Sequence, residues 1–299
     1  MRVAITGSTG LVGRALVRWF RDRGDSVTRV VRSYAGVPPH ERAVVWNPAG
    51  QTIEAEGLEG HDVIIHLAGE SIAGVWTTGR KRRIRASRVD GTRLLARTIA
   101  SLGAKPAALF SASAMGYYGN SARAVDESSP PGTGFLADIA EEWERCTKEA
   151  ANAGVRVVHM RFSNVLSADG GVLGALLPLF RLGLGATFGS GEQCWPWISI
   201  DDIGPAIGHL MQHPEIAGPV NFVSPEKTTN AQLTRAIARA VHRPSILAVP
   251  AFAARLAPGG MGDEILLGGA CMKPRRLLDS GYGFLHPSLD PALKALLRA

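Results

Sequence analysis

Three glycines near the start of the chain have a spacing that can bind phosphate. Gly7, Gly10 and Gly13 follow an apolar run at residues 3–6 and open a stretch at residues 11–23 in which apolar residues recur at helical spacing. The first glycine permits the tight bend, the second lets a phosphate approach the backbone, and the third lets the helix pack closely on the strand. Helix N-terminal amides then attract a diphosphate. The candidate phosphate-binding residues are Gly7, Ser8, Thr9, Gly10, Leu11, Val12 and Gly13. An ordinary strand-to-helix turn is the alternative, because the spacing G-x-x-G-x-x-G differs from the usual dinucleotide fingerprint.

The end of the second predicted strand, at residues 26–31, indicates which dinucleotide would bind. An acidic residue there would bind the ribose 2′-hydroxyl of NAD, whereas a cation would bind the 2′-phosphate of NADP. Arg32 and Ser33 occupy this position, and Asp25 precedes the strand. Because a guanidinium can bind phosphate through two hydrogen bonds, the sequence favours NADP(H) over NAD(H). An exposed arginine without a ligand is the alternative.

Predicted strands and helices alternate along the first half of the chain. The strands are expected at residues 3–6, 26–31, 43–46, 62–66, 107–111 and 155–160, and the helices at 11–23, 78–101 and 136–153. Parallel neighbours need crossover connections, which helices supply, so we expect an α/β, doubly wound parallel (Rossmann) sheet. After residue 166 the alternation loosens through a glycine-rich run, which indicates a smaller C-terminal α+β substrate lobe. We therefore expect an NADP-binding domain at residues 1–166, which a strand near 220–223 could rejoin, and a substrate lobe at 167–299.

Composition indicates an ordinary globular protein. Of the 299 residues, 45% are hydrophobic and 20% are charged. No stretch approaches the roughly 18 apolar residues of a membrane-spanning helix, and the first apolar strand starts at Val3, which leaves no room for a charged leader. Cys146, Cys194 and Cys271 lie far apart, without the paired spacing of a disulfide framework or a structural zinc site. These features predict a cytoplasmic protein with no metal site and no membrane partner.

The net charge of +7 lies in one segment, at residues 80–97, where eight basic residues face Asp90 alone. Proteins held to nucleic acid by charge usually spread basic residues over a face and add a recognition motif, and the chain has no such motif. We therefore expect no nucleic-acid partner and interpret the segment mainly as a solvated helix face.

The motifs described so far resemble the extended short-chain dehydrogenase/reductase superfamily, together with His66-Leu67-Ala68-Gly69 at the end of the fourth predicted strand. The resemblance continues through the segments Ser111-Ala112-Ser113-Ala114-Met115-Gly116-Tyr117-Tyr118-Gly119, Arg161-Phe162-Ser163-Asn164-Val165-Leu166 and Trp197-Ile198-Ser199-Ile200-Asp201-Asp202. More narrowly, the chain resembles the atypical YfcH-like NAD(P)-dependent epimerase family, which carries a C-terminal domain of unknown function, here at about 247–297. The residues that carry this narrower likeness are Gly69-Glu70-Ser71-Ile72, Lys81, Ile84, Ser87-Arg88, the Gly-Tyr-Tyr-Gly run and Gly283-Phe284-Leu285-His286-Pro287.

This resemblance implies a nucleotide-sugar-epimerase-like fold, with the dinucleotide across the strand ends and a substrate between the lobes. It places further residues beside the cofactor, namely Leu67, Ala68, Gly69, Ser111, Arg161 and Asn164. It does not supply a substrate.

The proton relay typical of the superfamily is missing. That relay is a Tyr whose pKa is lowered by a Lys one helical turn later. None of the four tyrosines has a lysine four residues on, because those positions hold Pro38, Ser121, Ala122 and His286. When Glu144 is taken to mark the helix shared with the superfamily, Leu136 and Ala140 fall at the positions where the relay's Tyr and Lys would stand.

Other residues are candidates for the chemistry. Ser113 matches the superfamily's substrate-binding serine, Tyr117 or Tyr118 could bring a phenol to the same site, and Glu70 follows a strand end that faces the cofactor. Core packing for the tyrosines and a solvated loop for Glu70 are the alternatives. The candidate substrate-binding residues are Lys81, Arg88, Trp195 and Trp197, for which a solvated helix face and hydrophobic packing are the alternatives. His66 is interpreted as a core residue rather than a metal ligand, because it has no partner at ligand spacing.

We therefore expect an NADP(H)-dependent oxidoreductase or epimerase that acts on a small polar carbonyl or sugar-like substrate. The alternative is a catalytically degenerate NADP(H)-binding sensor or interaction protein, suggested by the missing Tyr and Lys. A homodimer formed through the long helices is implied by the resemblance alone.

Overall fold

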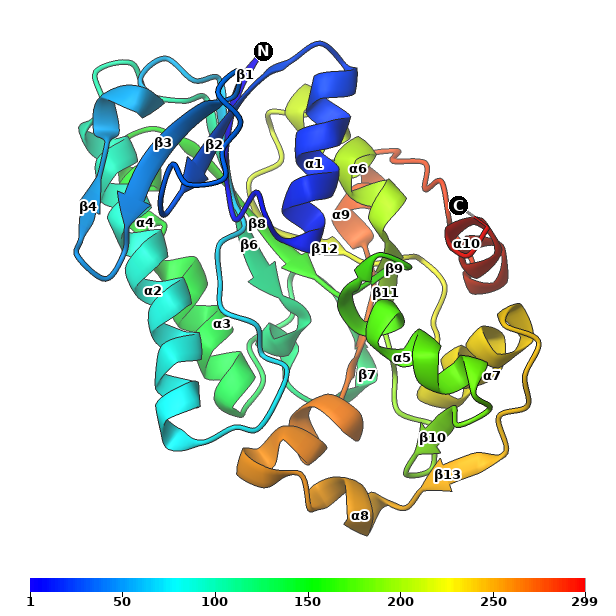
Figure 1. Cartoon of the computed structure of the whole chain (residues 1–299). Coiled ribbons are helices and arrows are strands. Elements are labelled where there is room, and N and C mark those ends of the chain that lie inside the picture. The colour runs from blue at the N-terminus through cyan, green and yellow to red at the C-terminus, as the bar shows by residue number, and fades with distance from the viewer. Residues whose placement is uncertain (299) are drawn as a thin grey trace.

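The computed structural model, which describes residues 1–298, is built around one eight-stranded sheet (Figure 1). All neighbouring strands in it are parallel except β3 and β4, which are antiparallel. Across the sheet the strands are β12 (Gly218–Phe222), β8 (Arg156–Phe162), β6 (Ala108–Ala114), β5 (Val63–His66), β1 (Arg2–Thr6), β2 (Ser26–Val31), β3 (Arg42–Asn47) and β4 (Thr52–Ile53). The order reverses between β1 and β5, so the strand ends there form the crevice in which doubly wound sheets bind ligands. The predicted Rossmann fold is confirmed.

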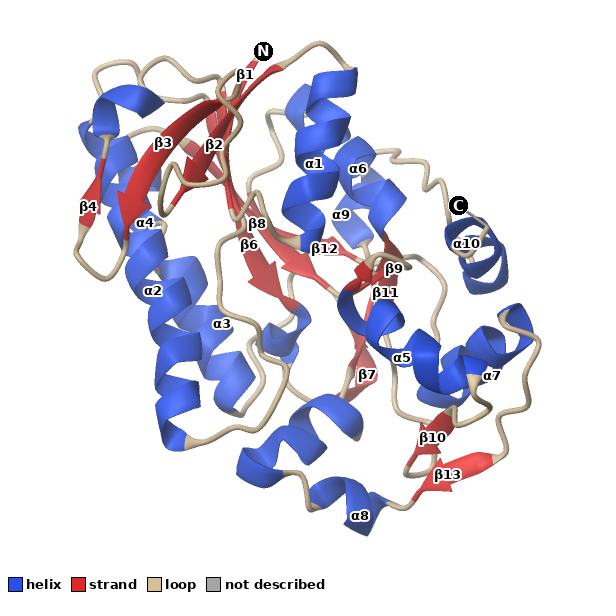
Figure 2. Cartoon of the chain, in the orientation of Figure 1, coloured by secondary structure: helices blue, strands red, loops and turns tan. Residues whose placement is uncertain are grey.

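Helices cover both faces of this sheet (Figure 2). One layer contains α1 (Leu11–Asp22), α6 (Ile200–Gln212) and α9 (Arg275–Asp279), and the other contains α2 (Thr78–Ser101), α3 (Phe135–Arg145) and α4 (Lys148–Asn152). Val3 and Ile5 of β1 pack against the first layer, whereas Ala4 between them packs against the second. This alternation buries each central strand on both faces, as a parallel sheet requires.

The remaining elements form a smaller lobe at the carboxyl ends of the strands. Its three two-stranded sheets are all parallel: β9 (Asn164–Ser167) with β11 (Trp197–Ser199), β10 (Ala186–Phe188) with β13 (Leu247–Val249), and β7 (Ser121–Val125) with β14 (Ala270–Met272). Its helices are α5 (Gly171–Arg181), α7 (Asn230–Ala240), α8 (Ala251–Arg255) and α10 (Leu289–Leu296). Short 3-10 or π turns complete the chain: η1 (Ala55–Leu58), η2 (Met115–Tyr118), η3 (Pro258–Gly260) and η4 (Gly262–Leu266).

The two parts of the chain interleave. The strand expected near 220–223 is β12, which pairs with β8 in the main sheet. Residues 275–279 also return from the lobe, because α9 packs on β12 of the main sheet. None of the helices in residues 1–298 combines the length and apolar character that crossing a lipid bilayer requires.

One predicted helix is interrupted. The helix expected at residues 136–153 forms as α3 and α4, with the break at Cys146 and Thr147. The Thr147 hydroxyl donates to the Glu144 carbonyl at 2.8 Å and lies 2.9 Å from His159 Nε2 on β8. Such local bonds from threonine to the backbone compete with the helical pattern.

Candidate functional site

The glycine turn after β1 has the geometry that its spacing predicts. Gly7 has a φ of +64°, and a Cβ there would lie 2.8 Å from the Leu67 carbonyl carbon. A Cβ on Gly13 would overlap the Gly7 carbonyl oxygen. At Gly10, by contrast, a Cβ would meet only the Gly7 carbonyl oxygen within 4 Å, at 3.3 Å. Gly7 and Gly13 thus hold the turn together, whereas Gly10 faces open space.

Unpaired amides surround that open space. Helix α1 begins with Gly10 as its N-cap, without a capping side chain or an acidic residue in its first turn. Its first backbone bond runs from the Arg14 amide to the Gly10 carbonyl, so the amides of Leu11, Val12 and Gly13 have no acceptor within residues 1–298. Three converging donors at the positive end of a helix are suited to an anion.

The remaining turn residues support this arrangement. The buried Ser8 hydroxyl accepts from Arg29 Nε at 3.2 Å, and the Thr9 carbonyl accepts from Arg14 at 2.7 Å. Both bonds hold the turn in place, and neither uses the amides of Leu11, Val12 and Gly13.

The tip of β2 presents a free cation. Arg32 and Ser33 are exposed, and Arg32 has no partner in the part of the chain that the structure describes. Ser33 Oγ accepts from the Ala35 amide. The nearby acid, Glu41, is bound by Arg21 and Arg29 at 2.9 Å each, and these hydrogen bonds lower its pKa to about 2. The guanidinium of Arg32 is therefore available for an anionic ligand.

Hydrogen bonds from Thr6 join the end of β5 to the glycine turn. Thr6 Oγ1 accepts from the Leu67 and Ala68 amides at 3.0 and 3.2 Å and lies 2.8 Å from His66 Nδ1. The other ring nitrogen of His66 lies 2.9 Å from the Thr92 hydroxyl, and burial lowers the pKa of His66 to about 4. His66 is therefore a neutral core residue that orders this edge. Leu67 and Ala68 are half-buried, whereas Gly69 is exposed.

A cavity of about 130 Å³ lies beyond these strand ends. Its walls come from α2, η2, α3 and the C-terminal segment around η4. Leu136 and Ala140, at the two positions of the missing relay, line it. These two side chains give the cavity an apolar surface, and their equivalence to the superfamily's Tyr and Lys stays a prediction. Among the predicted site residues, Arg88, Asn164 and Trp195 also line the cavity.

Arg88 is held rigidly at the cavity wall. Its Nη1 donates to the Glu70 carbonyl at 2.9 Å and to the Ile84 carbonyl at 3.1 Å. Its guanidinium carbon lies 5.1 Å from the Trp143 ring, and the Trp143 Nε1 donates to the Thr92 hydroxyl at 2.8 Å. Burial lowers the pKa of Arg88 to about 10, so it stays charged at neutral pH.

The candidates Ser113, Tyr118 and Arg161 belong to one buried network. The Ser113 hydroxyl donates to Glu144 at 2.6 Å, and Arg161 donates to both oxygens of the same carboxylate at 2.8 Å. The Tyr118 hydroxyl accepts from Arg161 at 2.9 Å and donates to Asn221 at 2.7 Å. Burial raises the pKa of Tyr118 to about 12. Both hydroxyl protons are thus directed into the protein interior rather than into the cavity.

Five other predicted site residues do not line the cavity: Tyr117, Glu70, Lys81, Ser111 and Trp197. Tyr117 is half-buried with the Arg161 guanidinium 3.4 Å from its ring centroid, and the Glu70 carboxylate faces Arg80 and Arg83. Lys81 lies over the rings of Trp76 and Phe135. Ser111 is buried in β6, and Trp197 is fully buried with its indole donating to Thr228. Asn164, which does line the cavity, donates to the Pro196 carbonyl at 2.9 Å.

The basic segment of α2 is largely exposed, as expected for a solvated helix face, and several of its side chains also bond to neighbouring segments. Arg80 donates to the carbonyls of Ser71 and Ala73, Arg85 makes two bonds to Glu142 of α3, and Arg97 pairs with Glu149 of α4. These contacts hold α2 against the helices beside it.

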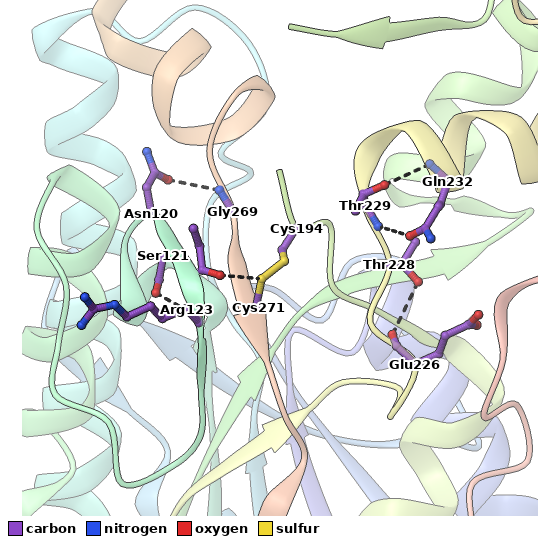
Figure 3. The surroundings of a disulfide bond; sticks show 11 residues. Asn120, Ser121, Arg123, Cys194, Glu226, Thr228, Thr229, Gln232, Gly269 and Cys271 are labelled. Atoms are coloured by element: carbon purple, nitrogen blue, oxygen red, sulfur yellow. Dashed lines mark hydrogen bonds between the residues drawn. A yellow bond between two sulfur atoms is a disulfide. The ribbon is translucent and has the colours of Figure 1, made fainter. Parts of the chain in front are cut away.

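The expectation of unpaired cysteines is wrong for two of the three. Cys194 and Cys271 form a disulfide, with Cα atoms 5.2 Å apart, and Cys146 is free (Figure 3). The pairing has no signal in the sequence, because 77 residues separate the two cysteines. Cys271 lies in β14, which pairs with β7, and Cys194 lies in the loop before β11. Gly269, two residues before Cys271, accepts no Cβ because one would overlap the Cys194 carbonyl oxygen. The bridge therefore joins two cavity walls, at Trp195 and Gly269.

Sequence reasoning missed the contribution of the C-terminal segment to this cavity. Glu264 lines it and accepts from the amides of Phe135 and Leu136, at the start of α3, at 3.2 and 2.9 Å. A single acid far along the chain gives no local signal of such a contact.

Comparison with known proteins agrees with this geometry. The sequence matches the model of the NAD dependent epimerase/dehydratase family over residues 3–223 and that of a domain of unknown function, DUF1731, over residues 249–296. Epimerase family protein MT2273 of Mycobacterium tuberculosis is 41% identical over 293 residues, which cover 97% of this chain and 96% of that protein. The crystal structure of human epimerase family protein SDR39U1 with NADPH is similar with a TM-score of 0.89 at 31% identity, covering 100% of this chain and 99% of that one. UDP-N-acetylglucosamine 4-epimerase from Bacillus cereus shares the fold alone, with a TM-score of 0.78 at 14% identity, over 99% of this chain and 95% of that one.

Proposed function

The chain belongs to the NAD-dependent epimerase/dehydratase family, and from this premise we propose that it is an NADP(H)-dependent oxidoreductase or epimerase acting on a small polar carbonyl or sugar-like substrate. The observation that carries the proposal is the turn from Gly7 to Gly13, where three unpaired amides surround open space over Gly10. A diphosphate fits this turn because the amides of Leu11, Val12 and Gly13 are otherwise unused.

The choice of NADP(H) rests on the tip of β2. Arg32 is exposed and unpaired among residues 1–298, whereas the acid Glu41 is already bound by two arginines. A guanidinium there favours a 2′-phosphate over a free hydroxyl. The human relative crystallised with NADPH supports the same choice for this chain.

When bound, NADP(H) supplies hydride exchange with the substrate carbon. The residues of this chain would then orient the substrate at the ends of β5 and β6 and keep water out of a cavity walled by Leu136, Ala140 and Trp143. Excluding water strengthens every electrostatic interaction with the charge that develops on the substrate oxygen.

Titration of the full-length protein with NADPH and NADH by calorimetry tests the cofactor. We expect NADPH to bind at least about tenfold more tightly than NADH, as a charge-assisted pair with phosphate provides. The variant Arg32→Ser should remove that preference. Gly10→Val should block both nucleotides with at most a small fall in the urea midpoint, because the Gly7 carbonyl oxygen, at 3.3 Å, is the one heavy atom outside its neighbours that its Cβ would meet within 4 Å.

Arg18→Ser is the matched control, since Arg18 is an exposed arginine on α1 away from the strand end. An absence of heat with every nicotinamide nucleotide, or an equal loss of preference in Arg18→Ser, would refute the assignment.

A second candidate, a binding protein without turnover, is supported by a separate observation. Leu136 and Ala140 replace the relay, and the hydroxyls of Ser113 and Tyr118 donate into the interior. NADPH oxidation measured against a panel of carbonyl compounds separates the two. Turnover that falls in a variant of the cavity wall supports the enzyme, whereas tight NADPH binding without turnover supports the sensor.

Three expectations remain predictions: a cytoplasmic location, a small-molecule partner and a homodimer. The Cys194–Cys271 bridge bears on the first, because disulfides persist mainly in oxidising compartments. Fractionation of cells that express the native chain checks the location.

A further inference from the structure

Arg88 leaves one edge of its guanidinium unpaired. Both bonds to the protein come from Nη1, which donates to the carbonyls of Glu70 and Ile84. The Nε and Nη2 groups have no protein partner within residues 1–298. Both groups are open to solvent rather than sealed in the interior. The Nε–Nη2 edge is the planar fork that matches a carboxylate with two parallel hydrogen bonds.

The surroundings of this fork favour one negative charge. Arg88 and Glu264 are the only charged side chains among the described residues that line the cavity. The Glu264 carboxylate is already bound by the Phe135 and Leu136 amides at the positive end of α3. Among the described lining residues, Arg88 is thus the charged group with unpaired donors in an otherwise largely apolar space, and an anion that entered would neutralise it.

The size of the cavity limits the rest of the ligand. Its volume is about 130 Å³, whereas pockets for drug-sized ligands span roughly 300–1,000 Å³. A dry cavity of about 150 Å³ holds a molecule of the size of benzene. A nucleotide sugar is several times larger, and its diphosphate would need more than one cation.

We propose, building on the NADP(H) binding of the proposed function and favouring the small carbonyl class of substrate over the sugar-like one, that this cavity binds a small carboxylate, with the carboxylate on the Nε–Nη2 edge of Arg88 and a short hydrocarbon part against Leu136, Ala140 and Trp143. The guanidinium is already fixed by two backbone carbonyls and the Trp143 ring, so little side-chain entropy is lost on binding. Gly69 brings the site next to the cofactor edge, because a Cβ on Gly69 would lie 3.4 Å from the Arg88 guanidinium carbon.

The closing experiment uses a charged ligand and its neutral isostere. The full-length protein, first shown by calorimetry to bind NADPH, is loaded with NADP⁺ and titrated with isovalerate, isovaleramide and UDP-glucose. We expect isovalerate to bind at least about tenfold more tightly than isovaleramide, and UDP-glucose not to bind in the cavity. The variants Arg88→Met and Arg88→Lys should remove the preference for the carboxylate, since neither presents the fork.

Arg82→Gln is the matched control, because Arg82 is an exposed arginine of the same helix that makes no contact with the cavity. Equal binding of isovalerate and isovaleramide by the unmodified protein, or a preference that survives in both Arg88 variants, would overturn this inference. Tight binding of UDP-glucose in the cavity would do the same. Because NADPH binding is measured first, its absence would refute the proposed function, whereas its presence without carboxylate selectivity would refute this inference alone.

Discussion

Opening the Cys194–Cys271 disulfide is expected to destabilise the folded chain by about 4.5 kcal/mol. The bridge closes a loop with a sequence separation of 77 residues, and the chain-entropy relation for a loop of this length gives that value at 25 °C. Both cysteines are buried, at 6% and 7% exposure, and in the chain-entropy model the main effect of opening the bridge falls on the unfolded chain. Urea unfolding of the oxidised protein, the protein reduced with dithiothreitol and the variant Cys271→Ser measures the difference. The midpoint should fall in the last two, and the m-value should rise because the unfolded chain exposes more surface.

The free cysteine provides the control. Cys146 lies at the break between α3 and α4 and forms no bridge, so Cys146→Ser should leave the midpoint of the oxidised protein nearly unchanged. Equal midpoints for the oxidised and reduced protein would refute the argument, as would a loss in Cys146→Ser that matches the loss in Cys271→Ser. NADPH affinity should be unaffected by reduction, because the glycine turn lies away from the bridge.

Two further perturbations test the buried polar groups. Burial lowers the pKa of His66 to about 4 from its usual value of about 6.5, so the unfolded state binds the proton first as the pH falls. Stability should therefore fall as pH decreases from 6.5 to 4, by up to about 3 kcal/mol, and the variant His66→Gln should lose this dependence in urea unfolding measured across that range. The variant Arg161→Met leaves the Glu144 carboxylate without its two charge-assisted bonds and should cost about 3–5 kcal/mol, whereas Glu144→Met in the same chain should recover part of the loss. Strictly additive losses in that double-mutant cycle would contradict the pairing.

The features that local spacing controls could be predicted from the sequence. The helix expected at 78–101 forms as α2 with the same bounds, and the glycines of the turn take the conformations their spacing indicates. Leu136 and Ala140 both line the cavity, because residues four apart lie on one face of a helix; their assignment to the relay positions stays a prediction. The fold class and the membership of the NAD-dependent epimerase/dehydratase family could also be predicted, because each family motif spans only a few consecutive residues.

Features that depend on distant partners could not be predicted. Ser113, Tyr118 and Arg161 each carry a group able to do chemistry, but their hydrogen bonds go to Glu144 and Asn221, on α3 and β12. Asp202, read in the sequence as part of a late Asp-Asp motif, is fully buried and accepts from the Leu285 and His286 amides, so it anchors the C-terminal tail. Neither partnership has a signature in sequence spacing, because each joins elements far apart in the chain that only the folded structure brings together.

The C-terminal segment around residues 264–269 closes one side of the cavity at the strand ends. Glu264 and Ile265 form one wall, and the Glu264 carboxylate binds the first amides of α3, which fixes the segment against the opposite wall. Gly269 continues this wall against Cys194, in contact so close that no larger residue fits. The fold that this chain shares with a nucleotide-sugar epimerase is therefore combined here with a small cavity. In this chain the segment that matches the domain of unknown function forms part of the cavity wall, and we propose that its contacts with α3 shape the specificity for substrate.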